Sequence, residues 1–383
     1  MTQRKIDKLT IRGFRSIQNL EEFPLSNLNI LIGANGVGKS NFVSYFRMLR
    51  ELVEKRLRLW INKQGGADRF LTYGVKKTNQ LFSEIFFGDY GYKFALEPTV
   101  DDELIFAAET FYNLTTGGFL LDKDDHIIVD EQIESSDDRF EHRLGAGHIE
   151  SKLKSNTTYR MSRYVYDSIA SWQVFHVHDT GDTSPMLPWR DTADYAFLRP
   201  DASNIAPFLY HLKQKFPRIY SEIIRVVRMV VPFFDDFLWQ PRELSPGEEQ
   251  IRLLWKQIDS DYVFQPSQLS DGSLRFICLV TALLQPNPPA TIIIDEPELG
   301  LHPYALTILG ALIRSVSTEV QLIVATQSVT LVNEFTPEDV IVVEREKGVS
   351  VFRRLSSEEL KDWLEDYTLG ELWEKNIVGG TPA

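Results

Sequence analysis

The sequence lacks the features that mark secreted and membrane proteins. It contains one cysteine, Cys278, so an intrachain disulfide framework is impossible and a reducing cytoplasm is expected. No apolar run approaches 18 residues, which predicts that no segment spans a membrane. The opening MTQRKIDKLTIRGF has no hydrophobic segment like that of a signal peptide and has the pattern of a strand.

Positive charge is also scarce, with 41 basic and 54 acidic residues and a net charge of −13. Proteins that coat nucleic acid are usually basic, because neutralisation of phosphates dominates their affinity. The acidic balance therefore argues against tight, autonomous DNA binding, although it does not exclude a local basic groove. The length of 383 residues predicts two to three domains with a substantial core.

Residues 31–41 read LIGANGVGKSN and contain the spacing G-x-x-x-x-G-K-[ST]. The apolar run Leu28–Ile32 predicts a strand before them, and apolar steps of three and four predict a helix that begins near Lys39. A tight strand-to-helix turn alone would need glycines but would not explain this spacing. The pattern therefore predicts a nucleoside triphosphate site.

Each residue type in this loop suits a bound phosphate. Gly36 and Gly38 permit backbone conformations in which successive N–H groups face phosphate oxygens. Lys39 would neutralise the β- and γ-phosphates, and the Ser40 hydroxyl would ligate Mg²⁺. The expected nucleotide-binding residues are Asn35, Gly36, Val37, Gly38, Lys39, Ser40 and Asn41.

Residues 291–300, TIIIDEPELG, predict a buried parallel strand that ends in two adjacent carboxylates. The carboxyl end of such a strand is where α/β sheets present their ligands. Asp295 is placed to hold Mg²⁺, and Glu296 to act as the base that polarises the attacking water. The alternative is a strand capped by solvated acids and followed by a turn at Pro297.

A third motif, LSDGS at residues 269–273, precedes this strand by about twenty residues and one apolar helix. Ser270 can cap the helix that is expected to begin near Leu274, and Gly272 permits a close approach of the backbone. The predicted helix N-terminus is suited to an anion.

The succession GANGVGKSN, LSDGS, IIIDEPELGLHP and VATQS resembles the ABC-type ATPase heads of the RecF and SMC class. It is most similar to the bacterial stand-alone predicted ATPases of the AAA family in this class, which include members of anti-phage defence systems. The similarity covers residues 4–50 and 265–378 well and the middle weakly. It implies an α/β fold, with an ABC-type P-loop NTPase core, an antiparallel β subdomain and a helical insertion, and it implies ATP and Mg²⁺ as cofactors.

The resemblance also implies a homodimer or higher homo-oligomer that sandwiches ATP. LSDGS matches the ABC signature, so Ser270 and Gly272 would contact the γ-phosphate held by another subunit, and Asp271 lies between them in place of the usual signature residue. His302, in GLHP, falls in the region that would face this partner.

Two further positions follow from the same resemblance. Gln327, in VATQS, occupies the switch position where transporters carry histidine. Glutamine can hydrogen-bond the γ-phosphate or the lytic water but cannot titrate, so slow hydrolysis is expected. Arg15, in GFRSI, matches a basic residue that lies near the nucleotide in this class.

The chain divides into three predicted parts. Residues 1–133 would form the N-terminal part of the head, with antiparallel strands between Leu81 and Asn113. Residues 134–264 would hold an exposed insertion at 134–160 and a helical lobe at 196–238. Residues 265–383 would complete the head. No long heptad run is present, so the coiled-coil arm of true SMC proteins is not expected.

The stretch SWQVFHVHDT, residues 171–180, allows three interpretations. His176, His178 and Asp179 have a spacing that could bind a metal ion. Alternatively, they end a strand and are satisfied by hydrogen bonds. The interpretation we prefer is that the strand corresponds to the one before the Q-loop, with His178 and Asp179 replacing the missing glutamine near the γ-phosphate. The basic and tyrosine-rich residues 152–166 similarly predict either a solvated helix face or a nucleic-acid contact.

After Gln327, the sequence predicts a hairpin that turns at Gly348 and a helix that opens with Ser356 and Glu359 as a capping box. Only 56 residues, 328–383, follow Gln327. They are too few for the Toprim nuclease domain that follows similar heads in OLD-family nucleases, so a nuclease would have to be a separate polypeptide.

These features predict a cytoplasmic ATPase that assembles in response to ATP. It would act in DNA maintenance or anti-phage defence and regulate a separate effector such as a nuclease, with DNA as a further candidate partner and no membrane association. One alternative is an ATP-dependent scaffold with negligible turnover. A transporter motor is the other, and the GFRSI opening and Gln327 argue against it.

Overall fold

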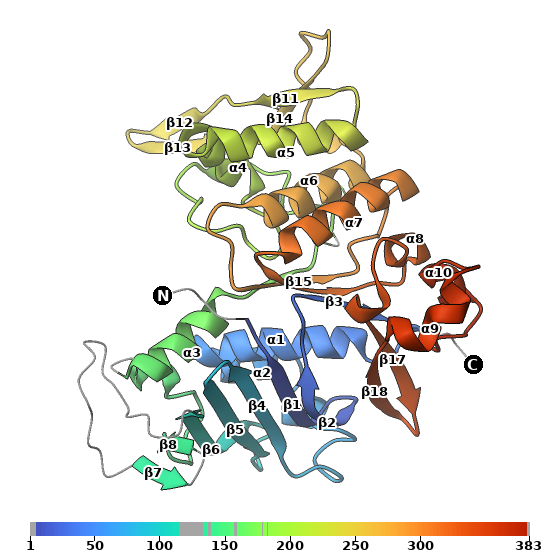
Figure 1. Ribbon diagram of the computed structural model, residues 1–383. Helices are drawn as coiled ribbons and strands as arrows, with labels where there is room; N and C mark the ends of the chain where they lie inside the picture. Colours follow the sequence, from blue (N-terminus) through green and yellow to red (C-terminus); the bar gives the residue numbers. More distant parts are fainter. Residues whose placement is uncertain are drawn as a thin grey trace.

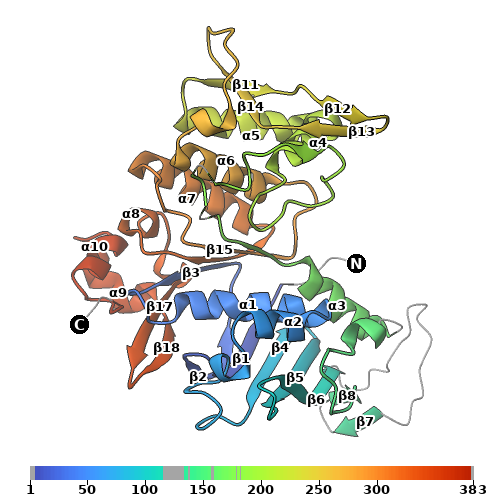
Figure 2. The same cartoon turned by 180° about the vertical axis from the view of Figure 1, so that it is seen from behind.

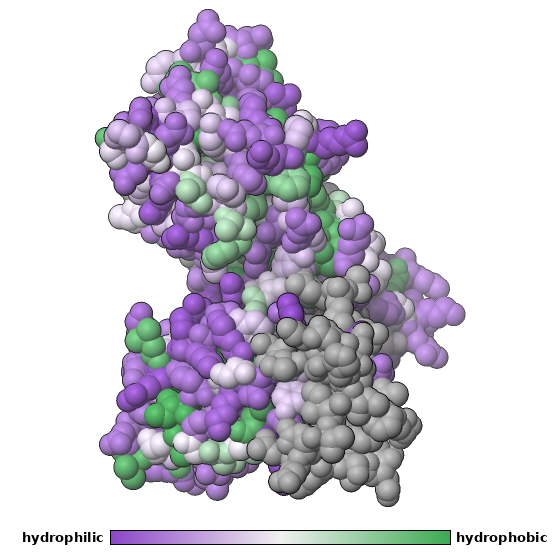
Figure 3. Space-filling model, turned by 90° about the vertical axis from the view of Figure 1, so that its left-hand side faces the viewer, coloured by the Kyte–Doolittle hydropathy of each residue, from purple (hydrophilic) through white to green (hydrophobic). Residues whose placement is uncertain are grey.

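The computed structural model describes residues 5–114, 133–136, 139–156, 159–177, 179–181 and 183–380, with the backbone alone at 133–136 and 139–140. The described chain is built in layers (Figure 1). An antiparallel sheet lies at one end, followed by a layer of helices, a central mostly parallel sheet and a second group of helices. The space-filling view shows a largely hydrophilic surface that narrows between the two ends of the molecule (Figure 3).

The antiparallel sheet has seven strands in the order β2-β1-β4-β5-β6-β8-β7. It confirms the antiparallel pairing predicted between Leu81 and Asn113. The strands are β1 (Lys8–Phe14), β2 (Ile17–Pro24), β4 (Leu81–Phe87), β5 (Tyr90–Pro98), β6 (Leu104–Asn113), β7 (Ile133–Ser136) and β8 (Arg139–Arg143).

The central sheet has six strands in the order β18-β17-β3-β16-β15-β9. All neighbours pair in parallel except β17 and β18, which form the predicted hairpin. The carboxyl ends of β3, β15 and β16 therefore meet at one edge of the sheet. The strands are β3 (Leu28–Ile32), β9 (Gln173–Phe175), β15 (Thr291–Asp295), β16 (Gln321–Ala325), β17 (Val340–Glu346) and β18 (Val349–Arg354).

Alternation along these strands divides the interior into two cores. Leu31, Ile293 and Ile323 point to the core shared with the antiparallel sheet, whereas their neighbours Ile30 and Ile292 point to the opposite core. The strands read as continuous apolar runs because both faces of the sheet are covered.

The helix α1 (Lys39–Val53) fills the space between the two sheets, and α2 lies beside it, as the view from behind shows (Figure 2). On the other face of the central sheet, α5 packs on α6 and α7. The remaining helices are α2 (Leu57–Lys63), α3 (Arg160–Ser171), α4 (Ile205–Lys215), α5 (Pro217–Val230), α6 (Asp271–Leu284), α7 (Pro303–Ser317), α8 (Val329–Val332), α9 (Ser357–Leu364) and α10 (Leu369–Glu374). No helix among the described residues is both long and apolar enough to cross a membrane.

The far end of the molecule carries two small sheets. These pair β11 (Phe234–Leu238) with β14 (Leu254–Gln257), and β13 (Glu248–Ile251) with both β10 (Arg190–Asp191) and β12 (Arg242–Ser245). The helical pattern predicted for 196–238 is confirmed for α4 and α5, but it is wrong for residues 196–204, which are not helical, and for the last five residues, which form β11. The 3-10 turns are η1 (Ala67–Arg69), η2 (Leu153–Asn156), η3 (Pro266–Gln268) and η4 (Pro337–Asp339).

The prediction of an exposed insertion at 134–160 agrees with the exposed residues 145–147 and is wrong for the residues that pack into the fold. The strand β8 pairs with β6, and Leu144, Ser151 and Leu153 are buried. The polar composition of this range predicted exposure, whereas some of its polar groups form hydrogen bonds inside the protein. The tyrosines of 152–166 also pack inward, since Tyr164 lies against Tyr90 and Tyr166 donates to Glu54.

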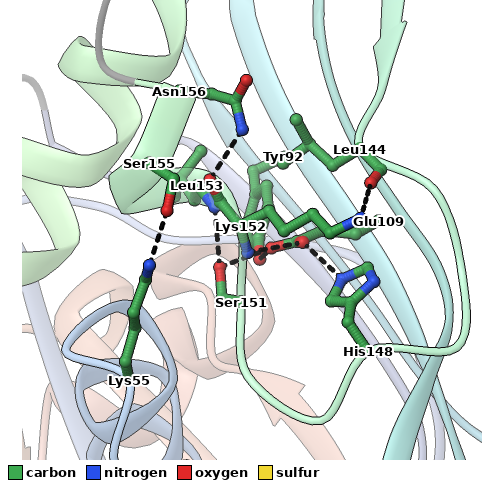
Figure 4. A network of polar contacts seen from close by, with 10 residues as sticks. All are labelled: Lys55, Tyr92, Glu109, Leu144, His148, Ser151, Lys152, Leu153, Ser155 and Asn156. Carbon is green, nitrogen blue, oxygen red and sulfur yellow. Dashed lines mark hydrogen bonds and ion pairs between the residues drawn. The ribbon is translucent and has the colours of Figure 1, made fainter.

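That internal network is centred on Glu109 of β6, which is fully enclosed (Figure 4). Its carboxylate accepts hydrogen bonds from Tyr92 Oη at 2.7 Å, from Ser151 Oγ and from the Lys152 backbone N–H at 3.0 Å, and it contacts His148 Nε2 at 2.8 Å. Burial, followed by the charge of Glu109, raises the pKa of Tyr92 well above its usual value, so its hydroxyl remains a donor. The network fastens residues 148–152 to the sheet.

The predicted capping box at the start of α9 is also corrected. Ser356 caps the helix by accepting from the Glu358 backbone N–H at 3.2 Å. Glu359 instead approaches Arg353 of β18 at 3.7 Å. Arg353 of the neighbouring hairpin therefore engages the Glu359 carboxylate, which the local pattern had assigned to the helix cap.

Candidate functional site

The loop between β3 and α1 has the backbone conformation that its glycines permit. Gly33, Gly36 and Gly38 have φ of 148°, 79° and 119°, in the left-handed half of conformational space. A Cβ at Gly38 would lie 2.0 Å from Ser350 Oγ, so a side chain is excluded there. The loop ends at Lys39, where α1 begins as predicted.

Two serines from distant parts of the chain support this loop. Ser16, in the turn after β1, accepts a hydrogen bond from Asn41 Nδ2 at 2.7 Å. Ser350 of β18 donates to the Val37 carbonyl and lies 2.7 Å from Ser16 Oγ. The sequence analysis did not identify Ser16 or Ser350, because the contact between them joins residues 334 positions apart.

Lys39 is buried beneath the loop, with 5% of its surface exposed. Its ammonium donates to the Gly33 and Ala34 carbonyls at 2.5 and 2.9 Å. Burial lowers the pKa of Lys39, and the nearby carboxylates of Glu296, Glu298 and Asp295 act in the opposite direction. The lysine is thus held between the loop and an acidic wall.

That wall is the end of β15. Asp295 is 7% exposed, and its Oδ1 has no hydrogen-bond partner among the described residues. Glu296 adopts φ of 49°, which is uncommon for a residue other than glycine, and its backbone N–H donates to the Ala325 carbonyl at 2.8 Å. Gln327, just beyond β16, donates from Nε2 to Glu296 Oε1 at 2.8 Å.

The phosphate loop and this wall enclose one cavity of about 110 Å³. It is lined by Asn35, Gly36, Gly38, Lys39, Ser40, Asn41, Glu296 and Gln327. The glycine cradle, the lysine and the unpartnered oxygen of Asp295 fit a nucleoside triphosphate with Mg²⁺, because they offer donors to phosphate and hard oxygens to the cation.

The structure adds Glu298 to the residues expected here. Its Oε1 accepts from the Gln327 backbone N–H, and burial raises its pKa above the usual value. Glu298 therefore fixes the segment that presents Gln327. Its position as the third acid in DEPEL was the signal available in the sequence.

Residues 28–333 match the family model described as "AAA domain, putative AbiEii toxin, Type IV TA system". The chain belongs to this AAA family. The chain therefore contains a P-loop ATPase domain of the AAA type. No curated protein gives a significant match.

Two of the solved structures similar to this AAA family member are heads of SMC proteins. One is an Smc head bound to the C-winged helix domain of ScpA, with 17% identity and a TM-score of 0.59. The other is an Smc head with an extended coiled coil, bound to the C-terminal domain of ScpA derived from Pyrococcus furiosus, with 15% identity and a TM-score of 0.55. Each comparison covers 94% of this chain and 99% of the other. At these identities the likeness shows the fold, and it confirms the predicted ABC-type class.

In this AAA family member, the histidine beside the cavity wall is His176, whose Nδ1 lies 3.6 Å from Asp295 Oδ2. Sequence analysis favoured His178 and Asp179 for this place. His178 lies outside the described residues. Asp179 is exposed and accepts from Thr183 Oγ1 at 3.3 Å, away from the cavity lining. The described residues contain no cluster of three or more metal-ligating side chains.

The LSDGS motif lies at the start of α6, which begins at Asp271 and not near Leu274 as predicted. Ser270 is the N-cap and accepts from the Ser273 backbone N–H at 3.1 Å. It is exposed and does not line the cavity. Gly272 packs against Gly300, since a Cβ there would lie 2.2 Å from the Gly300 carbonyl oxygen.

This contact yields a stability prediction. Gly272→Ala is expected to lower the free energy of unfolding by about 1–3 kcal/mol, because two backbone segments would have to separate. The midpoint of urea denaturation would measure the change. Gly181→Ala is the matched control, since its Cβ would meet nothing within 4 Å. Equal midpoints for both variants would contradict the close packing.

The two remaining predicted residues have local roles in the structure. His302 caps α7 by accepting from the Tyr304 backbone N–H at 3.2 Å. Arg15 lies over Phe70, with 4.9 Å between its guanidinium carbon and the ring centroid, and it does not line the cavity. Burial, followed by the charge of Arg47, lowers the pKa of Arg15. Their predicted roles at a dimer interface and near the nucleotide stay predictions.

Proposed function

We propose that the protein binds ATP with Mg²⁺ in this cavity, hydrolyses it slowly and uses the bound state to assemble. The observation that carries the proposal is the single cavity that joins the phosphate loop to Glu296 and Gln327. Ser40 and Asp295 would hold the Mg²⁺, which neutralises charge on the phosphate oxygens. Lys39 would exchange its two carbonyl partners for the β- and γ-phosphates.

Glu296 is the base in this proposal. Its carboxylate faces the cavity beside Gln327 and would accept a proton from the attacking water. The amide of Gln327 would orient Glu296 and that water without exchanging a proton itself. Glu298 supports this arrangement because it holds the Gln327 backbone.

A second subunit would complete the site. Ser270, Asp271 and Gly272 lie at an exposed helix N-terminus that does not line the cavity of their own chain, which favours contact with the γ-phosphate of another chain. His302 follows Gly300, which packs against Gly272, by two residues, and it would face the partner. The result would be a head-to-tail homodimer, or a larger oligomer, with ATP at each interface.

A mixing experiment tests this arrangement. Ser270→Arg and Lys39→Ala are each expected to lose at least 90% of phosphate release, for different reasons. A one-to-one mixture should recover part of the activity, because the Lys39→Ala subunit supplies an intact Ser270 to the phosphate loop of the other. Light scattering should show an ATP-dependent increase in mass for wild type and for the mixture.

The mixture also has a clear negative outcome. If it remains as inactive as the separate variants while both bind each other, the signature does not act in trans. If Ser270→Arg alone retains full turnover, Ser270 is only a helix cap.

We infer a regulatory role for the assembled state, in DNA maintenance or anti-phage defence, with a separate effector such as a nuclease. A head of similar fold binds the C-winged helix domain of ScpA, which supports an interaction with another protein but does not identify it. Phosphate release with and without DNA would test DNA as a further partner.

The second candidate function is an ATP-dependent scaffold with negligible turnover. The hydrogen bond from Gln327 Nε2 to Glu296 Oε1 favours it, because it occupies one oxygen of the proposed base. A constitutive oligomer with no measurable phosphate release would support the scaffold and reject the switch.

A further inference from the structure

A second and larger cavity, which we call the arginine cleft, lies outside the phosphate site. Its volume is about 610 Å³. One wall comes from α1 and α2, and the other from β9 and the segment that leads to α4. The residues that matter here are Arg47, Arg50, Arg56, Trp60, Phe197 and Arg199.

Arg47 and Arg50 stand one turn apart on α1, and neither guanidinium group forms a hydrogen bond or ion pair with any residue that the structure describes. The Nε of Arg50 is fully buried without a partner. Burial lowers the pKa of both guanidinium groups. Two partly buried cations thus line the cavity without a direct ion pair to any described residue.

The acidic side chains nearby are already engaged. Glu51 accepts two hydrogen bonds from Arg56, at 2.8 and 3.3 Å. Glu54 binds Lys154 and Tyr166, both near 3 Å. In the opposite wall, Arg199 pairs with Asp194 at 2.9 Å. The lining also contains Asp201, which accepts a hydrogen bond from the Ser203 backbone N–H at 3.0 Å. Neither Glu51 nor Asp201 forms an ion pair with Arg47 or Arg50 among the described residues.

Burying a charge without a partner is costly, so such groups are normally paired or bind a ligand. An acidic protein that keeps two unpaired arginines in one cavity is poorly explained by stability alone. Guanidinium groups recognise phosphate strongly, because their donors match its oxygens.

The cleft also presents aromatic surface. Trp60 packs on Phe70 with ring centroids 4.9 Å apart and lines the cavity with its remaining face. Phe197, in the other wall, is 50% exposed. Aromatic side chains beside arginines suit the stacking of a nucleobase. The volume lies within the range of small-molecule sites.

We propose that the arginine cleft is a second nucleotide site, in which Arg47 and Arg50 hold a phosphate and Trp60 or Phe197 stacks against the base. The ligand is either a free nucleotide or the 5′-phosphorylated end of a single strand, since both present the same phosphate and base. His176 lines the cleft and contacts Asp295 of the ATP site at 3.6 Å. His176 therefore connects a ligand in the cleft to Asp295, the proposed Mg²⁺ ligand.

Binding is tested in the Lys39→Ala protein, so that the phosphate loop does not contribute. The probe is a 5′-phosphorylated tetrathymidylate with a 3′ fluorophore, followed by anisotropy at fixed salt. Arg47→Met and Arg50→Met should each weaken binding about 10-fold or more, because each removes a charge-assisted contact. Arg58→Met is the matched control, since Arg58 lies on α2, pairs with Glu103 and does not line the cleft.

Competition separates the two sources of the ligand. Displacement by AMP would identify a free nucleotide, and displacement only by the 5′-phosphorylated strand would identify a strand end. Phe197→Ser or Trp60→Ala should reduce the advantage of AMP over inorganic phosphate. If inorganic phosphate competes as well as AMP, the nucleotide assignment is wrong.

Stability gives an independent readout. Without ligand, Arg50→Met is expected to keep or raise the melting temperature, because it removes an unpaired buried charge. A lower melting temperature would assign Arg50 a structural role and overturn the proposal. Absence of saturable binding, or an equal loss in Arg58→Met, would do the same.

The link to the ATP site rests on the proposed hydrolysis and is measured separately. In the otherwise wild-type protein, the competing ligand should change phosphate release at least twofold, and Arg50→Met should abolish this effect. If the protein releases no phosphate while Lys39→Ala still binds the probe through Arg50, the proposed function fails and the second site stands.

Discussion

Glu296→Gln is expected to lower the rate of ATP hydrolysis by about 10²–10⁴-fold while ATP binding is retained. The amide cannot accept the proton of the attacking water. Its oxygen can still accept the hydrogen bond from Gln327 Nε2, and its size preserves the backbone at φ 49°. The ATP-bound dimer should therefore accumulate. Phosphate release and light scattering with ATP and Mg²⁺ would measure the two effects.

The matched control for this change is Glu319→Gln, which removes the same charge from an exposed position after α7. It should hydrolyse ATP at the wild-type rate. If Glu296→Gln loses ATP binding and assembly together with turnover, Glu296 shapes the pocket and is not the base. If turnover is unchanged, another group accepts the proton.

Glu109→Ala should lower the free energy of unfolding by about 3–5 kcal/mol. The change removes the one acceptor shared by Tyr92, Ser151, His148 and the Lys152 backbone, and it leaves these groups buried without it. Amide hydrogen exchange should rise first in residues 148–152. Urea denaturation, followed by fluorescence, would measure the loss for the whole protein.

Glu21→Ala serves as the comparison within the same sheet. Glu21 lies on β2 and pairs with Arg12 at 2.8 Å, with nearly half of each side chain exposed. Its removal should change stability little, because exposed ion pairs are screened by solvent. A similar small effect of Glu109→Ala would mean that the 148–152 segment is held mainly by its apolar contacts.

The parts of the site that short motifs encode were predictable. The strand Leu28–Ile32, the helix from Lys39, and the two adjacent acids at the end of β15 follow from local spacing and hydrophobic pattern, and the structure confirms their positions. The antiparallel strands between Leu81 and Asn113 followed for the same reason. In each case, a few consecutive residues determine both the chemistry and the backbone conformation.

The remainder depends on contacts between distant segments. The alternating pattern of residues 173–179 does not predict which histidine lies beside β15. The parallel register pairs Phe175 with Ile294 and thereby places His176 beside Asp295. The polar residues 148–152 looked exposed because their acceptor, Glu109, lies some forty positions earlier. The arginine cleft forms between α1 and the segment before α4, and no local sequence pattern predicts that these two segments lie together.

The contact between Ser16 and Ser350 has a consequence for the stage of synthesis at which the protein can bind ATP. The phosphate loop is completed by β17 and β18, which pair beside β3 and place Ser350 against Val37. A nascent chain that has not yet released residues 340–354 from the ribosome therefore carries the nucleotide-binding motif without its finished pocket. Synthesis itself would delay ATP binding, and hence assembly, until residues 340–354 have joined the fold.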